Sequence, residues 1–101
     1  MTLSLHDTEH SIIQAYEASM DEAEYIRGQI DYAGCWGFIE GDMIHVYKTD
    51  DCSKSALVDL FAHELTHRDE KKLKAKQGED LAMLNAALCT EAYMMMTKIG
   101  G

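Results

Sequence analysis

Residues 61–67 read FAHELTH, a stretch that contains the pattern H-E-x-x-H inside a segment with helical periodicity. Side chains four residues apart lie on the same face of a helix, so His63 and His67 can hold one metal ion. Glu64 projects about 100° away around the helix axis, beside such an ion rather than on it. A carboxylate there can accept a proton from water, because zinc lowers the pKa of its bound water to about 7. The motif therefore predicts a zinc site with Glu64 as general base.

Composition narrows the class of protein. The chain has 101 residues, of which 47% are hydrophobic, and 18 acidic against 9 basic residues give a net charge of -9. We expect one domain with a modest core of two packed layers. The acidic excess argues against nucleic-acid or anionic-membrane partners, and no apolar run reaches the length of a membrane span. Unpaired Cys35, Cys52 and Cys89, and the lack of a signal segment, favour free thiols and a cytoplasmic location.

The first third of the chain predicts one helix followed by a short extended piece. Its apolar residues recur at three and four positions, namely Ile12, Tyr16, Met20, Ala23 and Ile26. Asp7 or Thr8 is a suitable N-terminal cap, and Gly28 is a plausible C-terminal stop. Gln29 to Ala33 reads as the extended piece.

The middle of the chain predicts a β-hairpin. Cys35 to Glu40 and Met43 to Lys48 are rich in aromatic and β-branched residues, and they flank the turn residues Gly41 and Asp42. Alternation along the second strand places Ile44 and Val46 on one face and Met43, His45 and Tyr47 on the other. Trp36 and Phe38 are expected to be core residues that cover a helix.

Two further helices complete the expected fold. The central one follows a polar turn that offers Asp51 or Ser53 as a cap, and it is expected to end near Lys76. The last one follows Gly78 and carries the stripe Leu81, Leu84, Leu88, Glu91 and Met95. A carboxylate on an apolar stripe needs a partner, so Glu91 is expected to meet a cation, a hydrogen-bond donor or a metal. The prediction is an α+β fold with an N-terminal helix, a small antiparallel sheet, an active-site helix and a C-terminal glutamate helix.

With this motif and a glutamate on the next helix, the chain resembles the zincin metallopeptidases of the gluzincin type. The resemblance is carried by the HELTH motif at residues 63–67 and by Glu91 on the following helix, and it extends roughly from Cys35 to Ile99. The size and the order of elements are similar to those of the minigluzincins. The resemblance implies that His63, His67 and Glu91 bind zinc and that Glu64 acts on the water. It also implies that an edge strand pairs with an extended peptide, for which Met43 to Lys48 is the candidate.

Two features of this family have no clear counterpart in the sequence. An acidic residue often follows the glutamate ligand by one turn, whereas residues 94–96 here are three methionines. The transition state also needs a hydrogen-bond donor for the developing oxyanion. Tyr93, Tyr47 and His45 are the candidates, and nothing in the sequence chooses among them.

The leading expectation is a zinc-dependent peptidase that hydrolyses peptide bonds by means of a metal-activated water. Its partner would be a peptide or protein substrate. One alternative is a non-catalytic acidic interaction or inhibitor protein of a mobile element, which the charge of -9 favours. Another is a zincin that cleaves one specific repressor-like partner.

Overall fold

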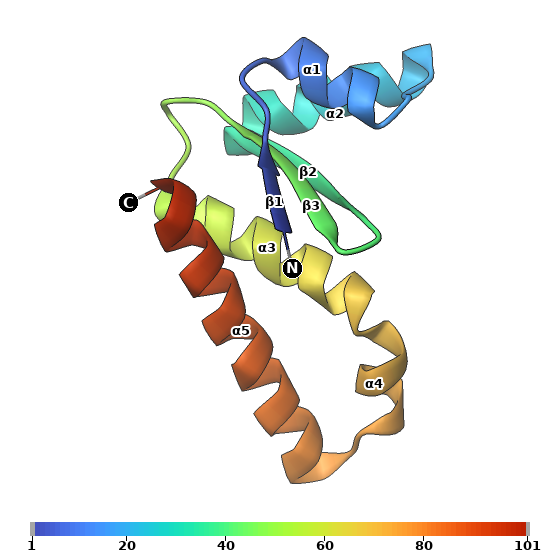
Figure 1. The fold of residues 1–101 in the computed structure, drawn as a ribbon, viewed down its shortest axis with the longest axis vertical. Coiled ribbons are helices and arrows are strands. Elements are labelled where there is room, and N and C mark those ends of the chain that lie inside the picture. Colours follow the sequence, from blue (N-terminus) through green and yellow to red (C-terminus); the bar gives the residue numbers. More distant parts are fainter. Residues whose placement is uncertain (1, 101) are drawn as a thin grey trace.

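The computed structural model describes residues 2–100 and shows a small α+β fold with three strands and five helices in that range (Figure 1). The elements in chain order are β1 (Thr2–Leu5), α1 (Glu9–Ala15), α2 (Met20–Ala33), β2 (Cys35–Glu40), β3 (Met43–Lys48), α3 (Lys54–Arg68), α4 (Glu70–Ala75) and α5 (Gly78–Gly100).

The predicted hairpin is confirmed, with β2 and β3 pairing antiparallel around the turn. The prediction of a purely antiparallel sheet is wrong, because the short strand β1 adds to β3 in parallel and gives the order β1-β3-β2. β3 is therefore the central strand, and β2 is one edge of the sheet. This order decides which strand can accept another chain.

Both faces of the sheet are covered, so the expected two layers are in fact three (Figure 1). On one face Ile44 and Val46 pack with residues of α3 and α5. On the other face Phe38, with Trp36 beside it, packs with residues of α1 and α2. The alternation predicted for β3 and the core role predicted for Phe38 are confirmed, whereas Trp36 is only partly buried against this core and also lines a groove.

The N-terminal segment forms two helices rather than the one expected. Thr8 caps α1 by accepting a hydrogen bond from the backbone of Ser11, as predicted for this position. The chain then breaks at Glu17, whose φ of 55° is incompatible with a continuing helix. Ser19 and Glu22 form a capping box that starts α2, a signal that the sequence reading overlooked.

Helix α2 continues past the predicted helix end at Gly28 and through the segment predicted to be extended. Gly28 lies within the helix, and residues 29–33, predicted to be extended, are helical. The stop is Gly34, which adopts the left-handed conformation with φ 79°. This geometry favours glycine because other residues meet a Cβ penalty there.

Ser53 caps α3 as one of the predicted alternatives, through a hydrogen bond from the Ala56 backbone N–H. The helix ends at Arg68, earlier than expected, and α4 follows as a separate turn. Helix α5 begins at Gly78 and runs back toward the start of α3, against which it packs (Figure 1). Although α5 has 23 residues, no helix within residues 2–100 is both long and apolar enough to cross a bilayer.

Two glycine substitutions should change stability in opposite directions. Gly28→Ala should raise the free energy of unfolding by about 1 kcal/mol, because it sits in a helix with nothing within 4 Å of an added Cβ. Gly34→Ala should lower it by at least ~1 kcal/mol, because the new Cβ would lie 2.9 Å from the Cys52 Cα and the backbone is left-handed. Urea denaturation of both variants tests this. Equal effects of the two variants would contradict the assigned helix end.

Candidate metal centre

The H-E-x-x-H motif lies on α3, whose rotation is set by its apolar face. Leu57, Phe61 and Leu65 are almost fully buried between the sheet and α5. This leaves His63 and His67 exposed on the outer side of the helix, one turn apart. The side chains that the motif predicts to be accessible are therefore accessible.

The two histidines already face one another. Their Nε2 atoms are 3.0 Å apart, close enough for one ring N–H to donate to the other ring. Two nitrogens bound to one tetrahedral zinc at 2.0–2.1 Å would be about 3.3 Å apart. A small rotation of either ring would therefore let both nitrogens bind one ion.

Glu64 lies between the histidines in sequence but is buried, with 9% of its surface exposed. Burial raises the pKa of the Glu64 carboxyl, and the charges of His63 and His67 and the Ile39 backbone N–H only partly offset this effect. A carboxylate with a raised pKa is a stronger proton acceptor than a solvated one. The position and environment of Glu64 thus suit a general base.

Glu91 is held by Arg68 rather than by the histidines. The Arg68 guanidinium donates to both Glu91 carboxylate oxygens, at 2.9 and 3.0 Å. It also donates two hydrogen bonds to Asp69, which is buried, and it lowers the pKa of the Asp69 carboxyl. The sequence correctly predicts that Glu91 needs a partner, and the structure supplies a cation.

The predicted ligand set is consequently only partly assembled. His63 and His67 lie together, but within the described residues no group of three His, Cys, Asp or Glu side chains is arranged to hold an ion. Arg68 is the residue that sequence reasoning missed. The available signal was its position, since it follows His67 directly on the helix that α5 packs against.

A groove of about 620 Å³ opens beside the motif. Its walls are α2 and α3, its floor is the start of β2, and His63 and Glu64 line one end. The expectation that Met43–Lys48 pairs with a substrate is wrong, because this strand is central and already has a neighbour on both sides. The strand that faces the groove with an open edge is β2.

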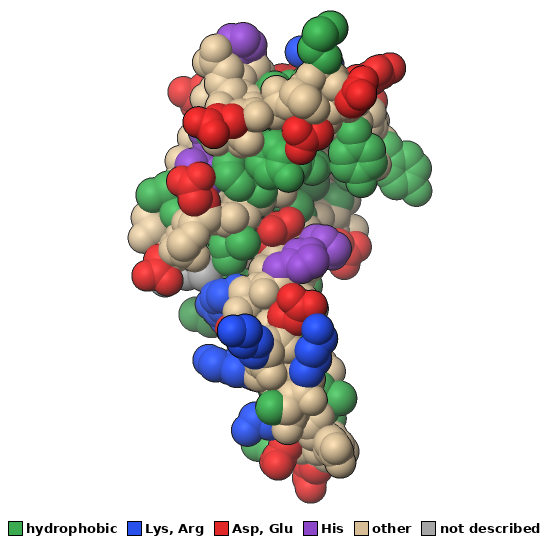
Figure 2. Space-filling model, turned by 90° about the vertical axis from the view of Figure 1, so that its right-hand side faces the viewer, with side chains coloured by type: hydrophobic (Ala, Val, Ile, Leu, Met, Phe, Trp, Pro, Cys, Tyr) green, Lys and Arg blue, Asp and Glu red, His purple; other side chains and the backbone are tan. Residues whose placement is uncertain are grey.

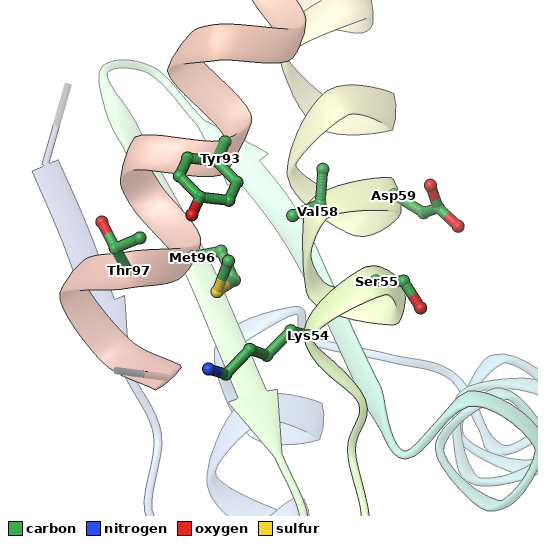
Figure 3. Close-up of a pocket in the computed structure, with 7 residues that line it drawn as sticks. All are labelled: Lys54, Ser55, Val58, Asp59, Tyr93, Met96 and Thr97. Carbon is green, nitrogen blue, oxygen red and sulfur yellow. The ribbon is translucent and has the colours of Figure 1, made fainter.

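The three predicted oxyanion donors all lie elsewhere. Tyr93 lines a different cavity of about 340 Å³ with Val58 and Met96 (Figure 3). His45 and Tyr47 project from the sheet face that α1 and α2 cover, opposite to the face that α3 covers. The Nδ1 atom of His45 is 2.8 Å from the Nε2 atom of His6, so the His45 ring is hydrogen-bonded to His6 and not directed toward the motif.

Two tyrosines of α2 line the groove instead. Tyr25 and Tyr32 are seven residues apart on one face of the helix, and they are 64% and 90% exposed. Their hydroxyl groups are the tyrosine donors that share a cavity with His63 and Glu64. The sequence prediction missed this pair because it ended the helix at Gly28 and treated residues 29–33, which include Tyr32, as extended.

Glu64→Gln should stabilise the metal-free chain at neutral pH but not in acid. Because the folded-state pKa of Glu64 is raised, burial of its charge costs nothing below the unfolded pKa of about 4.3. The cost develops as the pH rises from the unfolded pKa toward the raised folded-state pKa.

Urea unfolding at about pH 4 and pH 7 should show the variant gaining stability over the parent only at the higher pH. Glu24→Gln, which makes the same charge change at an exposed site on α2, is the control. A gap between parent and variant that is the same at both pH values would contradict the burial argument.

Comparisons with protein-family models, curated proteins and solved structures find no match to this chain. The resemblance to the gluzincins therefore rests on the motif residues and on Glu91.

Proposed function

We propose that the chain is a zinc-dependent peptidase of the minimal gluzincin type. The observation that carries the proposal is the pair of facing imidazoles, with Nε2 atoms 3.0 Å apart, beside a buried carboxylate at the end of an open groove. The i,i+4 spacing and the hydrogen bond between the rings hold both nitrogens where a single ion could bridge them.

Each side chain has a distinct role in this proposal. His63 and His67 would hold zinc through Nε2, and Glu91 would be the third ligand if it left Arg68. A zinc ion in such a site supplies a water of lowered pKa and polarises a carbonyl group. Glu64 accepts the proton of the water and then donates it to the leaving amine, for which its raised pKa is suited.

The edge of β2 offers a place for the scissile peptide. The Ile39 backbone N–H points toward Glu64, on the side away from β3. Because backbone groups alternate along a strand, the N–H groups of Gly37 and Cys35 point the same way. An extended peptide that pairs with this edge would lie in the groove and pass in front of His63 and Glu64.

One observation favours the alternative of a non-catalytic acidic interaction protein. The ion pair of Arg68 with Glu91 occupies the carboxylate that would complete the metal site, and the chain carries a net charge of -9. In that case the histidine pair would be a surface feature without a ligand. A peptidase that cleaves a single repressor-like partner is a narrower form of the main proposal.

Glu64→Gln should abolish hydrolysis while leaving zinc binding and the fold intact, because an amide cannot accept the proton of the water. Loss of a general base typically lowers the rate by about 10²- to 10⁴-fold. Parent and variant, each supplied with zinc, are incubated with a diverse peptide pool, and new termini are identified by mass spectrometry. Glu24→Gln should cleave like the parent. Cleavage by Glu64→Gln at the rate of the parent would remove Glu64 from the mechanism, and an inactive parent would favour the interaction protein.

A further inference from the structure

The charged residues of the groove are all acidic. Among the described residues that line it, the charged side chains are Asp59 and Glu64, and there is no Lys or Arg. Lysine and arginine side chains on the face seen in Figure 2 gather mainly below the histidines, toward the lower end of the molecule. The groove is therefore an anionic channel on a protein of net charge -9.

Asp59 is positioned to act within this channel. It lies on α3 one turn before His63 and borders both the groove and the cavity with Tyr93 and Met96, and its carboxylate points away from those two residues (Figure 3). Its carboxylate is exposed, and no ion pair or hydrogen bond to another described side chain occupies it. Across the groove Tyr25 and Tyr32 present exposed aromatic rings, whose faces attract cations.

The position of Asp59 along the groove follows from two neighbouring pairs. Asp59 lies near Cys35, since its charge adds to burial and to Cys52 in raising the pKa of that thiol. Glu64 lies near Ile39. Helix α3 and strand β2 therefore run in the same direction, and Asp59 and Glu64 are about 7.5 Å apart along the helix axis. An extended peptide spans that distance with about two residues.

We propose that the groove selects an extended peptide with a lysine or arginine about two residues from the bond placed at Glu64, with Asp59 binding the basic side chain between Tyr25 and Tyr32. This inference rests on the proposed function for the position of the bond, but the binding preference itself does not depend on hydrolysis. It defines the substrate class as basic peptide segments.

The test is peptide binding to the Glu64→Gln variant, which cannot turn the peptide over. Fluorescein-labelled decapeptides built on alanine and serine carry one central Lys, Ala or Glu, and their affinities are measured by fluorescence anisotropy with and without added zinc. We expect the Lys peptide to bind about tenfold more tightly than the Ala peptide, as one ion pair plus one cation–π contact can provide. The Glu peptide should bind most weakly.

Matched variants locate the preference. Adding Asp59→Asn should remove the difference between the Lys and Ala peptides, whereas Asp80→Asn, with the same charge change at the start of α5, should keep it. Equal binding of the three peptides, no binding at all, or a preference that survives Asp59→Asn would overturn the inference. Cleavage of peptides without a basic preference would overturn it and leave the peptidase proposal standing. If the chain prefers the Lys peptide in binding but hydrolyses no peptide, the inference stands and the peptidase proposal is overturned.

Discussion

The rotation of α3 about its own axis decides which side chains of the H-E-x-x-H motif are exposed and which is buried. Leu57, Phe61 and Leu65 are 2%, 0% and 0% exposed, and burial of each such side chain is worth about 1.5–3 kcal/mol. Turning the helix by a single residue would move these side chains by about 100° and put Val58, Ala62 and Thr66, or Ala56, Leu60 and Glu64, in their place. Core packing thus holds His63 and His67 outward and directs Glu64 toward the sheet edge.

The elements that depend on local patterns were predictable from the sequence. The hairpin has the predicted bounds because alternation and the Gly41-Asp42 turn both act within a few residues. The parallel addition of β1 was not predictable, because this four-residue strand pairs with β3 some forty positions later. That one pairing makes β3 central and moves the open edge to β2.

The site shows the same division between local and long-range information. Spacing on one helix predicts the convergence of His63 and His67, and the structure brings them together. Residue spacing cannot decide whether Glu91 binds a metal ion or a basic side chain. His67 and Arg68 are adjacent on α3, and both lie on the helix that α5 packs against. The choice depends on side-chain packing between two helices.

The Arg68–Glu91 ion pair would have to open for the proposed centre to take up zinc. Arg68 also binds the buried Asp69, so it keeps a carboxylate partner when Glu91 leaves. This lowers the cost of releasing Glu91, because removal of one partner does not leave the guanidinium unpaired.

Calorimetric titration with zinc tests the central claim most directly. The parent should bind one zinc per chain, Glu91→Ala should bind it much more weakly, and Glu70→Ala, a matched change on exposed α4, should bind it like the parent. If the parent binds no zinc, the metal centre is contradicted. If Glu91→Ala binds zinc as tightly as the parent, Glu91 is only the partner of Arg68, and the gluzincin ligand set is wrong.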